Sequence, residues 1–327
     1  MDHDTAKWQR LCKSDPENLE FQRAAIKARA RVDGPRVLLE PLVNHQFWAE
    51  VASWRRELTL EAITQLLGDD YQYLGLQEFA CGDQKHSIAQ FEHKASELVF
   101  HLIPGGRFEM GSNDFAQEQP VHTVDVAPFL LGQFSVTQSQ WDRLGGEDSR
   151  AFLGEDLPIE TISWQDAEEW LGRLGDEFRF PSESEWEYAC RGNTSTDFFW
   201  GEDYFSETME RFKDYSRTWF DLNSKGRSRP MSEHLDRPNS FGLIDMVGNV
   251  FEWCGDCWID QYESGPKTEK IRHRSKDSSK VLRGGSWRSS AADLRSANRA
   301  RCEPWQRRGE AGLRVALDVP GWKENNS

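Results

Sequence analysis

Apolar residues recur at helical spacing near the start of the chain. In DPENLEFQRAAIKARARV, apolar positions from Phe21 to Val32 repeat every three or four residues, and Asp15 and Pro16 precede them as a cap and first-turn pair. This spacing places one face of a helix against a core. We therefore expect a helical N-terminal region over residues 1–70.

A second helix and then a change of period follow. The stretch TLEAITQLLGDD predicts a helix with Thr59 as its N-cap and Gly68 at its end. From about residue 72 apolar and polar residues alternate across turn signals in HSIAQFEHKASELVFHLIPGGRFEMGS, as they do in β-hairpins. We expect a β-hairpin lead-in over residues 71–99.

Two later helices carry their own start signals. SWQDAEEWLGRLG begins with Ser163 as N-cap, and PSESEWEYACR begins with Ser182, where Glu185 completes a capping box. The runs around these helices are short and strand-like. Eleven of the 14 tryptophans lie after residue 140, and their large side chains with indole N–H groups are suited to holding irregular loops in place. The pattern predicts a loop-rich fold with little regular secondary structure.

Charge and composition narrow the range of partners. The chain of 327 residues has 55 acidic and 40 basic residues and a formal net charge of −15. This balance repels phosphate backbones and anionic lipids, so we expect neither a nucleic-acid nor a membrane partner. The N-terminus is polar where a signal peptide needs an apolar run, which predicts a cytoplasmic protein. The six scattered cysteines are typical of reduced thiols.

The order of short motifs along the chain resembles one family. IPGGRFEMGS, FSVTQSQW, PIETISWQDAEEWL, FRFPSESEWEYACRG, GLIDMVGNVFEWCGDCW, VLRGGSW and GLRVAL are similar to motifs of the formylglycine-generating-enzyme, or sulfatase-modifying-factor, family. They run in the family order from about Phe100 to Leu317. The resemblance implies an α+β domain over residues 100–320 with a variant of the C-type lectin fold, followed by a tail over residues 321–327.

The oxidative chemistry of that family is not expected in this chain. The resemblance implies that its formylglycine-generating members hold copper with two cysteine thiolates after the GGS motif, and Cu(I) prefers such soft ligands. This chain has Ser289, Ser290 and two alanines there, and no cysteine between Cys257 and Cys302. The N-terminal histidines also lack the H-x-x-x-H-x-E pattern of an iron-binding branch. We predict no copper site, and we keep an oxygen- or metal-dependent oxidoreductase without the thiol pair as the alternative function.

The stretch GNVFEWCGDCW supports two further hypotheses. Asn249 and Glu252 match residues that the resemblance assigns to a structural calcium site; alternatively, Asn249 only forms hydrogen bonds within a tight turn. Cys254 and Cys257 have the C-x-x-C spacing of a redox pair or half of a zinc site. Because the resemblance makes this stretch a strand, whose side chains alternate between two faces, we favour the interpretation that Cys254 packs in the core, as we do for Cys190.

The C-terminal segment is the predicted ligand site. It is basic in an acidic protein, and guanidinium groups bind peptide carboxylates in a bidentate geometry. The family motifs assign Arg283, Arg295, Arg299 and Arg314 to the scaffold. The candidate ligand-binding residues are Ser286, Trp287, Arg288, Ser289, Asn298, Arg301, Trp305, Arg307 and Arg308. We predict a non-catalytic module that binds a peptide or protein, and the layout also resembles the diversified segment of retroelement variable proteins.

Overall fold

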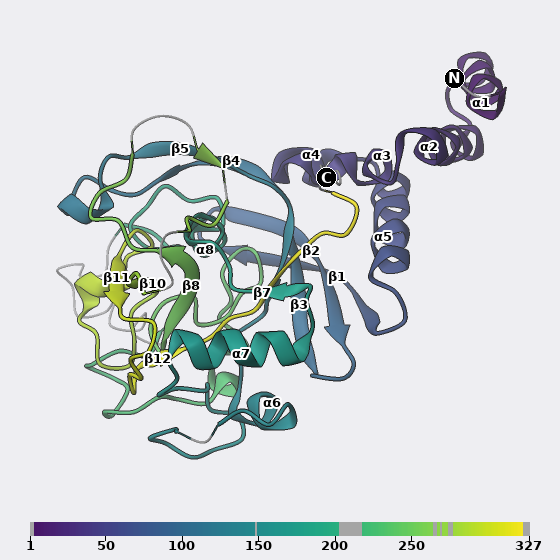
Figure 1. Cartoon of the computed structure of the whole chain (residues 1–327). Coiled ribbons are helices and arrows are strands. Elements are labelled where there is room, and N and C mark those ends of the chain that lie inside the picture. Colours follow the sequence, from purple (N-terminus) through teal and green to yellow (C-terminus); the bar gives the residue numbers. More distant parts are fainter. Residues whose placement is uncertain are drawn as a thin grey trace.

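A helical arm precedes a mixed helix-and-sheet body in the computed structural model (Figure 1). The structure describes residues 3–147, 149–202, 218–263, 267–268, 270–273 and 277–322. The N-terminal helices are α1 (His3–Ser14), α2 (Leu19–Asp33), α3 (Arg36–Leu39), η1 (Glu40–Val43), α4 (His45–Glu50) and α5 (Ser53–Leu67). α1 and α2 project away from the body, whereas α3, α4 and α5 lie against it (Figure 1). The predicted helical N-terminal region is therefore present, with different boundaries for two of its helices.

The first predicted helix begins later than expected. Its N-cap is Asn18, whose side-chain oxygen accepts hydrogen bonds from the backbone N–H groups of Glu20 and Phe21. Asp15 belongs to the turn that closes α1, because its own N–H donates to the Leu11 carbonyl. The assignment of Asp15 and Pro16 as the cap was therefore wrong.

The assignment of Thr59 as an N-cap was also wrong. α5 begins six residues earlier, at Ser53, and Thr59 lies buried inside it. Its hydroxyl donates to the Leu38 carbonyl over 2.8 Å, which joins α5 to α3. The predicted end of this helix at Gly68 is confirmed.

Three sheets form the body, and the predicted hairpin is part of the largest. The first sheet has the order β1-β2-β3-β6-β13-β7, the second β11-β10-β8-β12 and the third β4-β5-β9. The strands are β1 (Tyr71–Cys81), β2 (Gln84–His93), β3 (Leu98–Ile103), β4 (Gly106–Met110), β5 (His122–Val126), β6 (Phe129–Gly132), β7 (Phe178–Arg179), β8 (Phe251–Cys257), β9 (Lys267–Thr268), β10 (Lys280–Arg283), β11 (Arg299–Cys302), β12 (Ala311–Gly312) and β13 (Ala316–Asp318). The β1–β2 hairpin pairs directly with β3, so it continues the sheet of the body.

Two helices in the body begin where the sequence predicted. The remaining helices within the described ranges are η2 (Ala116–Glu118), α6 (Gln138–Arg143), α7 (Trp164–Leu174), α8 (Glu183–Arg191), η4 (Met231–His234) and η5 (Ala291–Leu294). Ser163 caps α7, and Ser182 caps α8 with the reciprocal contact from Glu185. These capping boxes confirm both start signals. The expected α+β class is confirmed, although β1 and β2, with 11 and 10 residues, are longer than the short strands expected.

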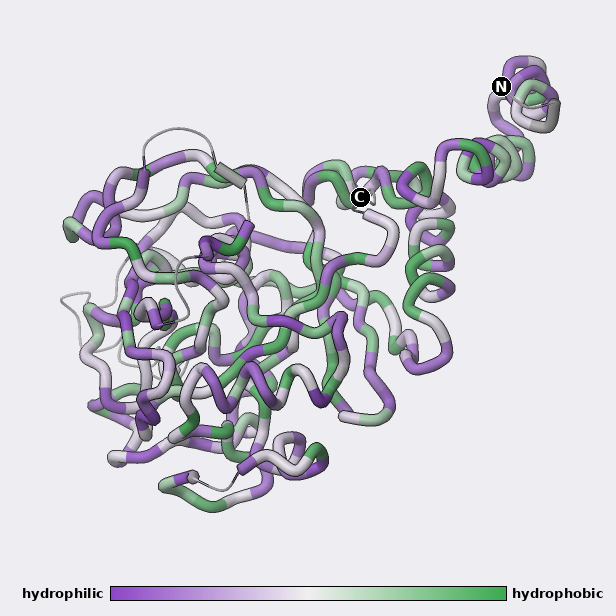
Figure 2. Tube along the Cα trace, in the orientation of Figure 1, coloured by the Kyte–Doolittle hydropathy of each residue, from purple (hydrophilic) through white to green (hydrophobic). Residues whose placement is uncertain are grey.

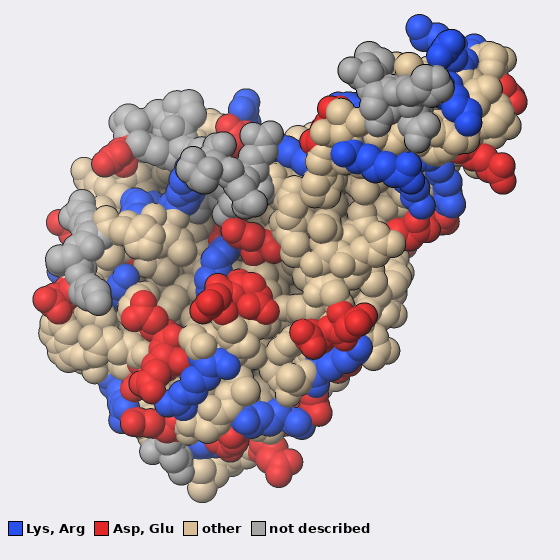
Figure 3. All heavy atoms as spheres, turned by 45° about the vertical axis from the view of Figure 1, so that its right-hand side comes forward, with Lys and Arg blue, Asp and Glu red and all other residues tan. Residues whose placement is uncertain are grey.

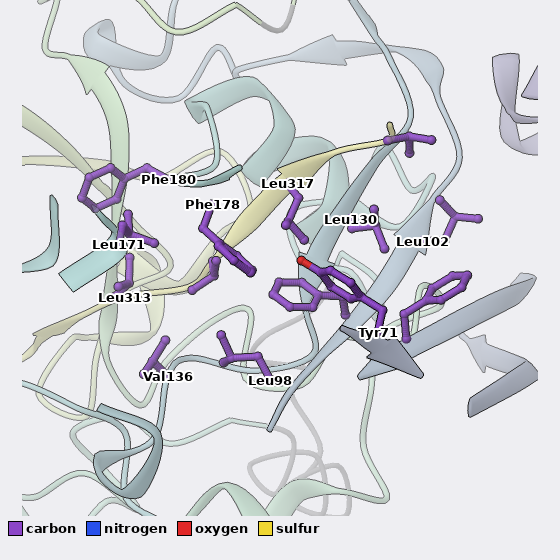
Figure 4. Close-up of a cluster of buried hydrophobic side chains, with 14 of the residues drawn as sticks. Tyr71, Leu98, Leu102, Leu130, Val136, Leu171, Phe178, Phe180, Leu313 and Leu317 are labelled. Carbon is purple, nitrogen blue, oxygen red and sulfur yellow. The ribbon is translucent and has the colours of Figure 1, made fainter. Parts of the chain in front are cut away.

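The core joins the N-terminal helices to the sheet. Leu60 and Ile63 of α5 lie in one apolar cluster with residues of the sheet. Figure 4 shows part of this cluster, including Tyr71, Phe178 and several leucines. Trp322, the last described residue, belongs to the same cluster, and the Arg36 guanidinium lies 5.0 Å from its ring centre. Hydrophobic stretches run through the middle of the body, while polar stretches outline its loops (Figure 2). The domain core therefore includes residues from both ends of the described chain.

Charge is distributed unevenly over the surface. Lys and Arg side chains gather along the projecting arm, whereas acidic and basic side chains are intermingled over the body (Figure 3). Within the described residues, no helix is both long and apolar enough to cross a membrane.

Candidate functional site

A buried arginine holds the C-terminal segment in place. Arg283 at the end of β10 is fully buried, and its guanidinium donates to the backbone carbonyls of Ser296, Ala297 and Asn298 over 2.5–3.1 Å. It also pairs with Glu187 of α8, which is itself fully buried. Because the guanidinium spans two elements, it fixes the loop between β10 and β11 against α8.

A second buried carboxylate supports the same segment. Glu183 accepts hydrogen bonds from Arg299 and from the Tyr262 hydroxyl, and it pairs with Arg272. Burial raises the pKa of Glu183, but the neighbouring arginines, Arg299 first, outweigh this effect and lower it to about 2. Glu183 is therefore ionised in the folded protein at neutral pH, and the network is a fixed electrostatic frame.

Arg295 and Arg314, the other scaffold arginines, are also paired with carboxylates. Arg295 makes a bidentate ion pair with Glu118 at 2.8 and 2.9 Å. Arg314 is fully buried and pairs with Glu252. The prediction that Arg283, Arg295, Arg299 and Arg314 are structural is confirmed.

The residues predicted to hold calcium do not fit a calcium ion. Both carboxylate oxygens of Glu252 accept hydrogen bonds from Arg314 at 2.8–3.0 Å, and they also accept from the Trp186 indole and the Ser135 hydroxyl. A divalent cation here would lie beside a buried guanidinium, which is electrostatically unfavourable. Asn249 instead exchanges hydrogen bonds with the backbone of Arg229, twenty residues earlier, so it joins two loops and does not only stabilise its own turn as the alternative proposed.

The C-x-x-C cysteines belong to the packed interior. Cys254 and Cys257 are both buried, and burial raises the pKa of Cys254 well above its ordinary value. Trp253 lies in the first apolar cluster and Cys254 in the second, which confirms the predicted alternation along β8. Cys190 is fully buried in the second cluster, and burial raises its pKa to about 12. Thiols held neutral in this way are poor nucleophiles and metal ligands.

Three predicted ligand-binding residues instead serve the structure of their own loop. The Ser289 hydroxyl accepts from the Ser286 backbone N–H, and the two hydroxyls lie 3.3 Å apart. The Asn298 side chain donates to the Asp293 carbonyl over 2.7 Å. All three side chains are buried, so they are not available to a ligand on the surface.

Three of the predicted arginines already have carboxylate partners. Arg307 pairs with Asp166 and Glu147 at 2.6–2.7 Å, and these hydrogen bonds raise its pKa. Arg308 pairs with Glu310, and Arg301 with Asp260. Trp305 is 55% exposed. The three arginines predicted to bind a ligand are therefore already paired, Arg308 with a near neighbour in the sequence and Arg301 and Arg307 with distant acids.

Trp287 and Arg288 belong to a region of aromatic, aliphatic and basic side chains. The Trp287 indole N–H donates to the Gly309 carbonyl over 3.2 Å, and its ring meets Phe152 edge-on at 5.6 Å. The Arg227 guanidinium lies 5.2 Å from the Phe152 ring centre. We call this region the Trp287 surface; it consists of Phe152, Leu153, Leu222, Arg227, Trp287 and Arg288.

Loops that are distant in the sequence assemble the Trp287 surface. The Ser224 hydroxyl donates to the Trp287 carbonyl, and the Asp221 N–H donates to the Ser289 carbonyl, so the 220–228 loop lies beside the GGSW turn. No local sequence signal marks Leu153, Leu222 or Arg227, since they lie in separate loops outside the recognised motifs.

No alternative metal centre emerges from the described side chains. Across the described ranges, no group of three or more His, Cys, Asp and Glu side chains has the geometry to hold a metal ion. Ser289 stands where a copper-binding thiolate would be needed. Its hydroxyl is a hard oxygen ligand that already accepts a hydrogen bond within its own turn, so the segment does not fit Cu(I). The oxygen- or metal-dependent oxidoreductase stays a prediction.

Comparison with known proteins agrees with the recognised motifs. The family model described as "Sulfatase-modifying factor enzyme 1-like domain" matches residues 85–319. The formylglycine-generating enzyme of Thermomonospora curvata is 25% identical over 284 residues, covering 66% of this chain and 92% of that protein. The solved structure of PvdO from Pseudomonas aeruginosa has a TM-score of 0.62 and 26% sequence identity, covering 70% of this chain and 97% of that chain.

One further relative is much longer. Serine/threonine-protein kinase pkn1 of Chlamydia pneumoniae is 30% identical over 257 residues, which cover 68% of this chain. The matched part is 38% of the kinase, so the chain spans about two fifths of the length of this curated relative.

Proposed function

Because the chain belongs to the sulfatase-modifying factor enzyme 1-like domain family, we propose that it is a binding module of that family whose Trp287 surface receives an acidic, leucine- or aromatic-containing segment of a peptide or protein. The proposal concerns recognition and includes no chemical step. In the pkn1 relative the matched part makes up 38% of the protein, so a domain of this kind also occurs joined to other sequence.

Uncompensated positive charge is the observation that carries the proposal. Among the described residues, Arg227, Arg288 and Lys225 have no carboxylate partner, whereas Arg229, Arg301, Arg307 and Arg308 each have one. Lys225 and Arg227 lie in the 220–228 loop, which packs beside the turn that carries Arg288, so these exposed cations form a local site for a carboxylate-bearing ligand on a chain of net charge −15. Guanidinium groups favour carboxylates because they bind them through two parallel hydrogen bonds.

Exposed apolar side chains on the protein favour a ligand that also carries apolar residues. Leu153 is 75% exposed and Leu222 is 67% exposed, the two highest values among the large hydrophobic side chains of the described residues. Large apolar groups on a soluble surface often mark interaction sites, particularly when polar groups surround them. An acidic ligand that also carries leucine or aromatic residues would bury Leu153 and Leu222.

Trp287 supplies a rigid anchor beside the cations. Its indole is held by the Gly309 carbonyl and by the edge of Phe152, so little side-chain entropy is lost when a ligand packs against it. Tryptophan and arginine are also the residues most often found at the energetic centre of protein interfaces.

The test is binding of short fluorescent peptides in which glutamate alternates with leucine or phenylalanine, measured by anisotropy. The full chain is expected to bind them and to release them as salt is raised, because exposed charges are screened. Arg288→Ala and Arg227→Ala should each weaken binding roughly 10-fold, as expected for the loss of a charge-assisted hydrogen bond. Peptides with lysine in place of glutamate should not bind.

Arg301→Ala is the matched control. It removes a guanidinium that is also exposed but already paired with Asp260, so peptide affinity should stay unchanged. The proposal fails if Arg301→Ala weakens binding as much as Arg288→Ala, or if the lysine peptides bind as well as the glutamate peptides.

A further inference from the structure

A polar groove separate from the Trp287 surface lies beside the loop that follows α8. It consists of two hollows, of about 350 Å³ and about 290 Å³, that share Asn193, Thr194 and Ser195. Volumes near 300 Å³ lie at the lower end of the ~300–1,000 Å³ range of small-ligand sites. We call this feature the Asn193 groove; it shares no residue with the Trp287 surface.

The shape of the groove is fixed by its surroundings. Asn193 has a left-handed backbone with φ of 75°, and its amide donates to the Gln84 side chain over 2.8 Å, which joins the loop to the tip of the β1–β2 hairpin. Thr194 and Thr196 donate their hydroxyl hydrogens to the Arg191 and Phe198 carbonyls. A ligand would therefore meet a preformed groove.

The groove presents mainly hydrogen-bond acceptors. Since the hydroxyl hydrogens of Thr194 and Thr196 are already donated, their oxygens face a ligand as acceptors. The side-chain oxygen of Asn193 and one carboxylate oxygen of Asp83 add to this set, and the Ser195 hydroxyl can donate or accept. Such a lining suits a ligand that carries many O–H donors.

An aromatic ring contributes to the wall of the larger hollow. Trp200 is stacked on Phe198 with a centroid distance of 5.0 Å and an interplanar angle of 12°, and Phe199 meets it edge-on at 4.7 Å. These contacts hold the indole plane rigidly at the hollow. The C–H faces of a sugar ring pack against an aromatic plane of this kind while its hydroxyls reach polar groups around it.

The charges of the groove disfavour an anionic ligand. The two guanidiniums that line the smaller hollow are both paired, Arg107 with Asp125 and Arg191 with Glu187, so an anion would find no free cation there. Glu109 lines the same hollow, and among the contacts of the described residues only one of its carboxylate oxygens accepts a hydrogen bond, from the Thr123 hydroxyl. Its other oxygen is a further acceptor for the O–H groups of a ligand.

We propose that the Asn193 groove binds a neutral oligosaccharide, with one sugar ring against Trp200 and a second ring in the smaller hollow. The shared loop supplies contacts to both rings, so a disaccharide binds more tightly than either monosaccharide.

The experiment is binding of the full chain to an array of neutral oligosaccharides, followed by saturation-transfer NMR on those retained. Asn193→Gly keeps the left-handed backbone accessible and removes the amide, so affinity should fall roughly 5- to 10-fold. Trp200→Phe keeps an aromatic ring with less area and should also weaken binding, and increasing salt should have little effect. Asn113→Gly, at an exposed position outside the groove, is the matched control.

Three results would overturn the proposal. The first is that no neutral oligosaccharide on the array is retained. The second is that Asn193→Gly weakens binding no more than Asn113→Gly does. The third is that sulfated glycans or lysine-rich peptides compete for the groove more strongly than neutral sugars, which would assign it to a charged ligand.

Discussion

Two buried histidines should make the folded state sensitive to mild acid. His86 and His101 are 7% and 0% exposed, and burial, as the largest cause, lowers the pKa of each from 6.5 to about 4. For His86 the neighbouring His45 ring lowers the pKa further. Both imidazoles are therefore neutral in the folded protein at pH values where the unfolded chain is already protonated.

The sign and size of the effect follow from proton linkage. The unfolded chain takes up a proton per histidine as pH falls below 6.5, while the folded chain does not until about pH 4. The stability that comes from keeping these histidines neutral is therefore complete above pH 6.5 and is lost as pH falls towards 4. At about 1.36 kcal/mol per pH unit, each histidine destabilises the fold by roughly 2 kcal/mol at pH 5 and about 3 kcal/mol at pH 4.

Urea unfolding followed by tryptophan fluorescence at several pH values between about 7 and 5 measures this effect. Replacing His86 by leucine removes one titrating ring, so the loss of unfolding free energy between pH 6.5 and pH 5 should be smaller by roughly 2 kcal/mol. His273→Leu, at an exposed position, should leave the loss unchanged. Burial also raises the pKa of Asp197 and Asp256, which opposes the effect, but this contribution is common to all three proteins and cancels in the difference.

The reasoning is refuted if His86→Leu loses as much stability in this pH range as the parent. It is equally refuted if NMR titration of the folded protein gives His86 or His101 a pKa near 6.5.

Three further outcomes are expected. Glu187→Gln leaves the buried Arg283 guanidinium without its counter-charge and should lower the free energy of unfolding by about 3–5 kcal/mol; a loss below 1 kcal/mol in urea titrations would contradict the proposed frame. Ser182→Ala removes the N-cap of α8 and should cost about 0.5–2 kcal/mol, whereas Ser290→Ala at an exposed position of a short 3-10 turn should cost less in the same assay. In the native protein a thiol reagent should modify Cys12, which is partly exposed, well before Cys190 or Cys254; rapid modification of Cys254 would contradict its placement in the core.

Local signals in the sequence predicted parts of the fold well. The N-caps Ser163 and Ser182 could be predicted because a capping box is completed within four residues. Thr59 carries the same type of side chain, but the residues before it continue the helix and its hydroxyl bonds to Leu38 in another element. A propensity pattern cannot distinguish a cap from such a tertiary contact.

The candidate site was predictable only in part, for a related reason. Trp287 and Arg288 were found because they follow a motif, but Arg307 was misjudged since its partner Asp166 lies 141 residues away in the sequence. Arg227 and Phe152 approach Trp287 through the packing of separate loops. Charge pairing and loop assembly depend on the three-dimensional fold, and a single sequence does not encode them locally.

The contact of Arg36 with Trp322 also has a mechanical consequence. Trp322 follows β13 by four residues, and β13 lies between β6 and β7 in the largest sheet. Force applied to the projecting arm is therefore carried through α3 and Trp322 into an interior strand. A load on the arm would therefore act on the interior of the largest sheet and not only on a chain end.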